Sequence, residues 1–215
     1  MKSIMFFIVL LFCSMASIGQ TKKLENQPKF AKFGLSIGGN YSNLSSGESL
    51  PDNAKFVNGV GINLGGWMEY PISKKLLFSP KAELSFNKAQ VDFRRQDNSK
   101  YRLFQSSLDF MVHFVYKISD KTNIPYLLFG PKLQLPFSKE PVVSSNFDKN
   151  NNNLAIDFGL GVIKTSKKYI LNPELRYSFG VINVNSHPLL GSLRYNSLSL
   201  VLKFKKIRSR VISNL

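Results

Sequence analysis

The segment from Asn153 to Val181 constrains the fold more than any other part of this chain. It reads NLAIDFGLGVIKTSKKYILNPELRYSFGV, two runs of alternating side chains joined by a short turn of Lys, Thr and Ser. In the second run, apolar residues occupy every odd position from Tyr169 to Val181, whereas Glu174 and Arg176 occupy even positions. Side chains two positions apart lie on one face of a β-strand. The pattern therefore predicts an antiparallel hairpin with one apolar and one polar face.

The same alternation recurs in six other parts of the chain. These further runs span residues 33–42, 60–70, 76–87, 104–116, 124–137 and 196–205. Long polar loops at 45–57, 88–100, 138–152 and 185–194 alternate with short turns at 71–75, 117–123 and 165–168. This rhythm predicts an all-β fold, an eight-stranded antiparallel up-and-down barrel with both termini at the short-turn end. The motif VDFRR at 91–95 could extend a strand and add one hairpin, so a barrel of ten strands is the alternative. The absence of helical periodicity after the N-terminal segment argues against α/β folds.

The distribution of charge between the two strand faces indicates what surrounds the barrel. Charges of both signs share the face opposite the aliphatic and aromatic side chains, whereas a soluble ligand-binding barrel would carry its charges outside. A lipid-facing charge costs about 2–4 kcal/mol at mid-membrane, so an uncharged outer face indicates a transmembrane barrel. The predicted barrel-interior network consists of Glu69, Lys81, Glu83, Asp109, His113, Lys132, Asp157, Glu174, Arg176 and Lys203.

The interior of an eight-stranded barrel is about filled by its own side chains. Because acids and bases are nearly balanced on the inner face, we predict a plugged interior of salt bridges around Glu174 and Arg176, not a wide pore. Aromatic residues near the ends of the runs are typical of the girdles that lie at membrane interfaces. The predicted girdle residues are Tyr41, Tyr70, Tyr116, Tyr126, Phe137 and Tyr169.

The N-terminus has the pattern of a secretory signal peptide. Lys2 is followed by an apolar run from Ile4 to Cys13 and by small residues that suggest cleavage near Gly19 and Gln20. The run is too short to span a membrane as a helix. With Cys13 removed, the mature chain has no cysteine for disulfide or thiolate chemistry. The expected segments are a signal peptide at 1–19, a periplasmic lead at 20–32, the barrel at 33–205 and a basic tail at 206–215.

No motif for a metal, a nucleotide or a catalytic nucleophile is found, so we predict no enzyme, no cofactor and no catalytic or metal-binding residue. The formal net charge of +16 would suit nucleic acid or anionic lipid. The basic residues do not form a dense cluster with aromatics, so nucleic acid is not expected as a partner. His113 and Asp109 share a strand face and are expected to be structural. Ser186 and His187 in an outer loop leave a lipid-modifying enzyme as a third alternative.

Three segments carry a resemblance to a known family: PYLLFGPKL at 125–133, DFGLGV at 157–162 and NPELRYSFGVINV at 172–184. They resemble outer-membrane β-barrel proteins of Bacteroidetes-type bacteria. The spacing from DFGLG to PELRYSFG is similar to that of PorT-type barrels of the type IX secretion system. In that family a strand of the form LE-apolar-Pro-apolar precedes the PYL strand, whereas LDFMVHFVY in this chain has Met111 at the proline position.

The resemblance implies an outer-membrane protein with no known enzymatic residues and an accessory role in protein secretion. The implied partners are outer-membrane lipid and proteins of the secretion system. The alternative is a small structural or solute-binding barrel whose outer loops, such as 138–152, contact other surface proteins or solutes. A small-molecule substrate is not expected under the secretion reading.

Overall fold

The computed structural model describes residues 31–47, 54–93, 100–102, 104–119, 123–137, 152–166, 168–184 and 192–206. Some predictions lie outside these residues. They concern the signal peptide at 1–19, the lead up to residue 30, the loop residues 138–151, Ser186 and His187, and the tail at 207–215. In the described part of the chain, no helix is long and apolar enough to cross a membrane.

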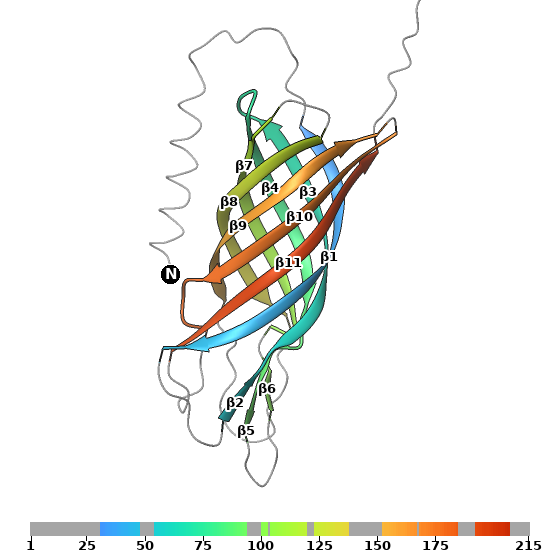
Figure 1. Cartoon of the computed structure of the whole chain (residues 1–215). Coiled ribbons are helices and arrows are strands. Elements are labelled where there is room, and N and C mark those ends of the chain that lie inside the picture. Colours follow the sequence, from blue (N-terminus) through green and yellow to red (C-terminus); the bar gives the residue numbers. More distant parts are fainter. Residues whose placement is uncertain are drawn as a thin grey trace, which may run out of the picture.

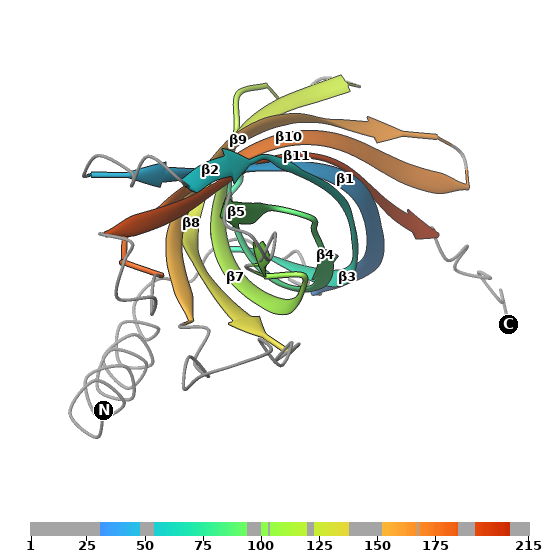
Figure 2. The same cartoon turned by 90° about the horizontal axis from the view of Figure 1, so that it is seen from below.

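Eight strands form one closed antiparallel barrel (Figure 1). They are β1 (Lys32–Ser46), β3 (Gly59–Pro71), β4 (Leu76–Phe86), β7 (Ser106–Lys117), β8 (Asn123–Pro136), β9 (Asn153–Thr165), β10 (Tyr169–Gly180) and β11 (Leu193–Lys206). Each barrel strand pairs with its neighbours in chain order, and β1 closes the ring by pairing with both β3 and β11. The end-on view in Figure 2 shows this ring. The predicted eight-stranded up-and-down barrel is confirmed.

Three short strands form a separate sheet beyond one end of the barrel (Figure 1). They are β2 (Ala54–Val57), β5 (Gln90–Phe93) and β6 (Lys100–Arg102). The prediction of plain loops at 45–57 and 88–100 was therefore wrong in part, and β1 also continues to Ser46. The short runs AKFV and QVDF pair with each other, and Val91 is fully buried. The open question of strand number is settled at eight for the barrel, because VDF belongs to this extra sheet.

The two ends of the barrel differ in their connections. The first, here called the turn end, carries the connections from β3 to β4, from β7 to β8 and from β9 to β10, together with the start of β1 and the end of β11. The second, here called the loop end, carries the three-stranded sheet. The first barrel strand thus begins and the last one ends at the turn end, as the alternation of loop lengths predicts.

The outer face of the barrel is apolar. Large hydrophobic side chains at alternate strand positions are exposed, and Leu200 in the middle of β11 is the second most exposed of them, at 65%. The intervening residues point inward and are buried. In water such a belt of exposed hydrophobic side chains would be strongly unfavourable, whereas lipid removes that cost. The wall therefore has the polarity of a membrane-spanning barrel.

The register of the barrel is interrupted at three places, and each interruption contains a proline. Pro80 lies at the gap between β4 and β3, Pro131 at the gap between β8 and β7, and Pro173 at the gap between β10 and β9. Each of these prolines is paired in register with the strand on its other side. Because proline has no backbone N–H, it cannot donate a ladder hydrogen bond to the strand across the gap. The wall thus lacks part of its hydrogen bonding at three seams.

The lipid-facing assignment predicts a position-dependent response to charge. Leu200→Arg places a cation at the middle of β11, where it should lower the free energy of unfolding by about 2–4 kcal/mol. Tyr169→Arg, at the turn end of β10, should cost only about 0–1 kcal/mol because the guanidinium can reach the interface. Urea titration of the protein in lipid vesicles measures both values. Equal losses for the two variants would contradict the assignment.

Candidate functional site: the filled interior of the barrel

The structure places all ten residues of the predicted network inside the barrel. Each has a relative exposure of 5% or less. They come from seven of the eight barrel strands, because only β1 contributes no charged member. The alternation of each strand is sufficient to aim these side chains inward, since residues two apart share a face. The site is therefore built by strand parity alone, without any special loop or cap.

Glu174 on β10 is the centre of the half of the network that lies toward the turn end. Its carboxylate accepts hydrogen bonds from Lys81 Nζ at 2.7 Å and from the Tyr126 hydroxyl at 2.9 Å. Lys203 Nζ lies 3.3 Å from the same carboxylate and donates to Glu69 at 3.0 Å. One carboxylate thereby joins β4, β8 and β11 across the lumen.

Arg176, two residues further along β10, is the centre of the other half. Its guanidinium donates to both carboxylate oxygens of Glu83, at 2.6 and 3.4 Å. Its Nε lies 3.7 Å from Asp157, which contacts His113 Nε2 at 2.9 Å. A planar guanidinium suits this role because it can engage a carboxylate at two points. Arg176 and Glu174 themselves approach to 3.7 Å, so the two halves are connected.

His113 and Asp109, which share the inward face of β7, have different partners. His113 contacts Asp157 on β9, and Asp109 forms an ion pair with Lys132 on β8 at 2.8 Å. Strand spacing predicts that His113 and Asp109 share a face but cannot predict which strand supplies each partner. Both residues are fully buried and paired, which fits a structural role.

A layer of neutral polar side chains continues the network toward the loop end. Asn40 forms hydrogen bonds with Asn63 and Asn87, and Asn87 donates to Ser42 at 2.7 Å. On another part of the wall, Gln134 donates to Ser107 at 2.9 Å. Sequence reasoning that selected charged residues missed this layer. Its signal was present, since Asn and Ser occupy the inward parity of β1, β3 and β4.

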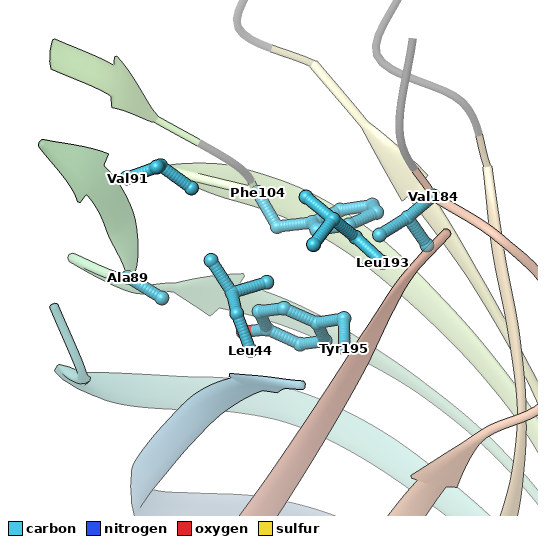
Figure 3. Packing of buried hydrophobic residues seen from close by; sticks show 7 residues of the cluster. All are labelled: Leu44, Ala89, Val91, Phe104, Val184, Leu193 and Tyr195. Atoms are coloured by element: carbon cyan, nitrogen blue, oxygen red, sulfur yellow. The ribbon is translucent and has the colours of Figure 1, made fainter. Parts of the chain in front are cut away.

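An apolar cluster closes the interior at the loop end (Figure 3). Its members are Leu44, Ala89, Val91, Phe104, Val184, Leu193 and Tyr195. The rings of Phe104 and Tyr195 lie 4.8 Å apart, and the Tyr195 hydroxyl donates to Ser42 at 2.8 Å. The alternation of the run at 104–116 groups Phe104 with Leu108 and Phe110 and so predicts an outward side chain, and this prediction was wrong. Its backbone φ of 52° interrupts the strand before β7 and turns the side chain into the cluster.

A second apolar cluster lies at the turn end and consists of Leu77, Val115, Tyr126 and Leu128, with Ile163 packed against it. Tyr126 was predicted to be a girdle residue, and this prediction was wrong. It is 1% exposed and its hydroxyl binds Glu174 inside the barrel. Its parity with Lys132 was the signal for this position, whereas its place near a strand end does not distinguish the two faces.

Two interior aromatic rings lie against glycines. A Cβ at Gly161 would come within 2.4 Å of the Tyr126 ring, and one at Gly34 within 2.3 Å of the Trp67 ring. The ammonium group of Lys203 lies 5.2 Å from the Trp67 ring centre and 5.3 Å from that of Tyr126. Glycine therefore gives both rings room to reach the buried cation, and such cation–π contacts are favourable where water is excluded.

The ten network residues comprise five carboxylates, four lysine and arginine side chains and one histidine. Buried charges are tolerated only when they are paired and hydrogen-bonded, because desolvation of each ion costs several kcal/mol. Here eight of the ten ions form one connected set, and Asp109 and Lys132 form a separate pair. In the part of the chain that the structure describes, no group of His, Cys, Asp and Glu could hold a metal ion. The arrangement can brace the wall and fill the lumen.

Comparison with known proteins identifies the family. A profile of the outer membrane protein beta-barrel domain matches residues 19–186, more than half of the chain. The chain belongs to this family. As a member it is an outer-membrane β-barrel protein. A search of curated proteins found no match.

Solved structures show the same fold. The outer membrane protein OprG from Pseudomonas aeruginosa is 12% identical, with a TM-score of 0.52 and coverage of 83% of this chain and 97% of that chain. Neisserial surface protein A is 14% identical, with a TM-score of 0.48 and coverage of 81% and 98%, respectively. At such identities the likeness to OprG extends to the barrel fold alone.

The central position of Arg176 predicts a large loss of stability when its charge is removed. Arg176→Met leaves Glu83 and Asp157 buried without their shared cation, which should lower the free energy of unfolding by about 3–5 kcal/mol. Urea titration in lipid vesicles measures the change. Arg194→Met is the matched control. Arg194 is exposed near the loop end and lies 6.0 Å from the Phe179 ring centre, so its replacement should cost only about 1 kcal/mol or less.

A double-mutant cycle tests the pairing itself. The loss for Glu83→Gln combined with Arg176→Met should be smaller than the sum of the two single losses by about 0.5–3 kcal/mol, because the residues are in direct contact. Strictly additive losses would show that the contact contributes nothing to stability.

Proposed function

We propose that this protein is a non-conducting outer-membrane barrel that acts as an accessory of protein secretion, as the resemblance to PorT-type barrels implies. The observation that carries the non-conducting character is the connected network around Glu174 and Arg176, which lies between two apolar clusters. The secretion role is supported by the segment at 172–184, which resembles that family and includes both central residues of the network.

The proposal includes a route to the membrane. The signal-peptide pattern at 1–19 supports export followed by cleavage, and the segment at 20–32 would then be a periplasmic lead. The barrel would be inserted with its turn end toward the periplasm, as short turns in such barrels are placed. The contacts of the protein with lipid and with secretion proteins would carry its function, and no catalytic step is involved.

A structural or solute-binding barrel remains the second candidate. The observation that favours it is the small sheet of β2, β5 and β6, which extends the protein beyond the barrel at the loop end and could contact other surface molecules. Purification from mild detergent separates the two candidates. Co-purification of secretion proteins supports the first, whereas a bound small ligand or no partner supports the second.

The filled interior predicts the absence of large ion currents. Folded protein, verified by its heat-modifiable mobility on gels, should produce no large and stable conductance steps in planar lipid bilayers. The reason is that ion pairs and apolar clusters occupy the lumen, and the interior of an eight-stranded barrel has room for little more than its own side chains. Large, long-lived steps from the folded protein would overturn the non-conducting assignment.

The secretion role predicts a loss of extracellular release. Deletion of the gene should reduce the amount of secreted cargo in the medium, and a plasmid copy should restore it. Immunoblots of medium and cell fractions measure the ratio, and detergent sensitivity of the cells controls for general damage to the outer membrane. Normal release of cargo in the deletion strain would contradict the secretion role and favour the structural or solute-binding barrel.

A further inference from the structure

Lysine residues gather at the turn end of the barrel. The set, here called the lysine rim, consists of Lys32, Lys74, Lys75, Lys117, Lys164, Lys168, Lys205 and Lys206. All are exposed except Lys117 and Lys205, which are partly exposed. Among the residues that the structure describes, none of them forms an ion pair. A rim of one sign of charge creates a strong local attraction for anions.

The lysines follow a repeated arrangement. On four strands, the outermost outward-facing aromatic at the turn end is directly adjacent in the chain to a lysine. The pairs are Phe33 with Lys32 on β1, Tyr116 with Lys117 on β7, Tyr169 with Lys168 on β10, and Phe204 with Lys205 on β11. Interfacial aromatics mark the headgroup level of a bilayer. The lysines therefore lie at or just beyond the level where lipid phosphates are found.

At the loop end the outermost outward aromatics have no lysine beside them in the chain, although the guanidinium of Arg194 lies 6.0 Å from the ring centre of Phe179. The outward aromatics of this end are followed in the chain by neutral residues: Tyr41 by Ser42, Phe86 by Asn87, Phe137 by Ser138, and Phe179 by Gly180. The adjacency of a lysine to the outermost aromatic is thus specific to the turn end, whereas the described cations of the loop end, such as Lys55, Lys88 and Arg194, do not follow it.

Neutralising carboxylates are scarce at the lysine rim. Glu69 is the one described carboxylate near the turn end, and it is buried and paired with Lys203. Lys205 is repelled by Lys32 and attracted by Glu69, which is thus one carboxylate shared among several lysines. In the sequence, the turn segments add Asp120 against Lys121 and Lys167. The rim therefore has an uncompensated positive charge that an external ligand can balance.

Two lysines of the rim lie on the lipid side of the wall. Lys206 is paired in register with Tyr169, and Lys164 with Leu171, and all four belong to the outward parity of their strands. A lysine stem can run along apolar surface while its ammonium group reaches a headgroup. This placement favours a ligand inside the leaflet over an acidic protein that approaches from the aqueous phase.

We propose that the lysine rim binds the phosphate groups of anionic phospholipids in the leaflet at the turn end. The ligand class is a phosphodiester headgroup with a net negative charge, such as phosphatidylglycerol. The lipid-facing lysines contact the phosphate from the side of the wall, and the adjacent aromatic rings pack against the glycerol region. Such binding fixes the depth of the barrel in the bilayer and is independent of any role in secretion.

The test measures lipid selectivity of the mature, folded protein in phosphatidylcholine vesicles. Electron paramagnetic resonance of trace spin-labelled phosphatidylglycerol or phosphatidylcholine gives the relative association of each lipid with the protein. One lysine near a membrane surface contributes about 1 kcal/mol, so wild type should prefer phosphatidylglycerol about fivefold or more. Sodium chloride at about 1 M should weaken the preference because it shortens the screening length to roughly 3 Å.

Matched variants locate the binding surface. Lys117→Gln, Lys164→Gln, Lys168→Gln and Lys206→Gln together should reduce the preference to about one. The control combines Lys55→Gln, Lys88→Gln and Arg194→Gln, which lie at the loop end, and should keep the wild-type preference. Heat-modifiable mobility verifies that both variants are folded. No preference in wild type, or an equal loss in both variants, would overturn the proposal.

Discussion

The fold depends on one constraint, which is that a backbone surrounded by lipid must satisfy its own hydrogen bonds. A flat sheet would leave two edges of unpaired N–H and C=O groups, each costing several kcal/mol in hydrocarbon. Pairing of β1 with both β3 and β11 removes those edges. Closure then creates a second requirement, because a ring of eight strands encloses a space that must be filled.

The chain fills that space with charged side chains in the middle and apolar side chains toward each end. Ion pairs around Glu174 and Arg176 occupy the middle, and a neutral layer of Asn and Ser side chains lies toward the loop end. One apolar cluster lies at the loop end and another at the turn end, where it lines the wall from β4 to β9. A purely apolar filling would give strands that are hydrophobic on both faces. Alternating polarity instead specifies which face points inward, because a shift of one residue would place charges in lipid.

The alternation of side chains predicts the barrel and the identity of its inward-facing residues, because strand parity is a local property. It does not predict that Glu174 contacts Lys81, since these residues are distant in sequence and meet only across the lumen. Phe104 departs from its expected face because a positive φ breaks the parity there. The sheet of β2, β5 and β6 was missed because its strands are too short for a periodic signal.

The three proline seams give the wall an uneven construction. They divide the ring into three panels of continuous pairing, namely β4 with β7, β8 with β9, and β10 with β11, β1 and β3. Most interior ion pairs join different panels: Arg176 joins β10 to Glu83 on β4, and Asp157 joins β9 to His113 on β7. The ion pairs inside the barrel thus connect the panels to one another, and the resistance of the barrel to deformation depends on these pairs as well as on the hydrogen bonds of the wall.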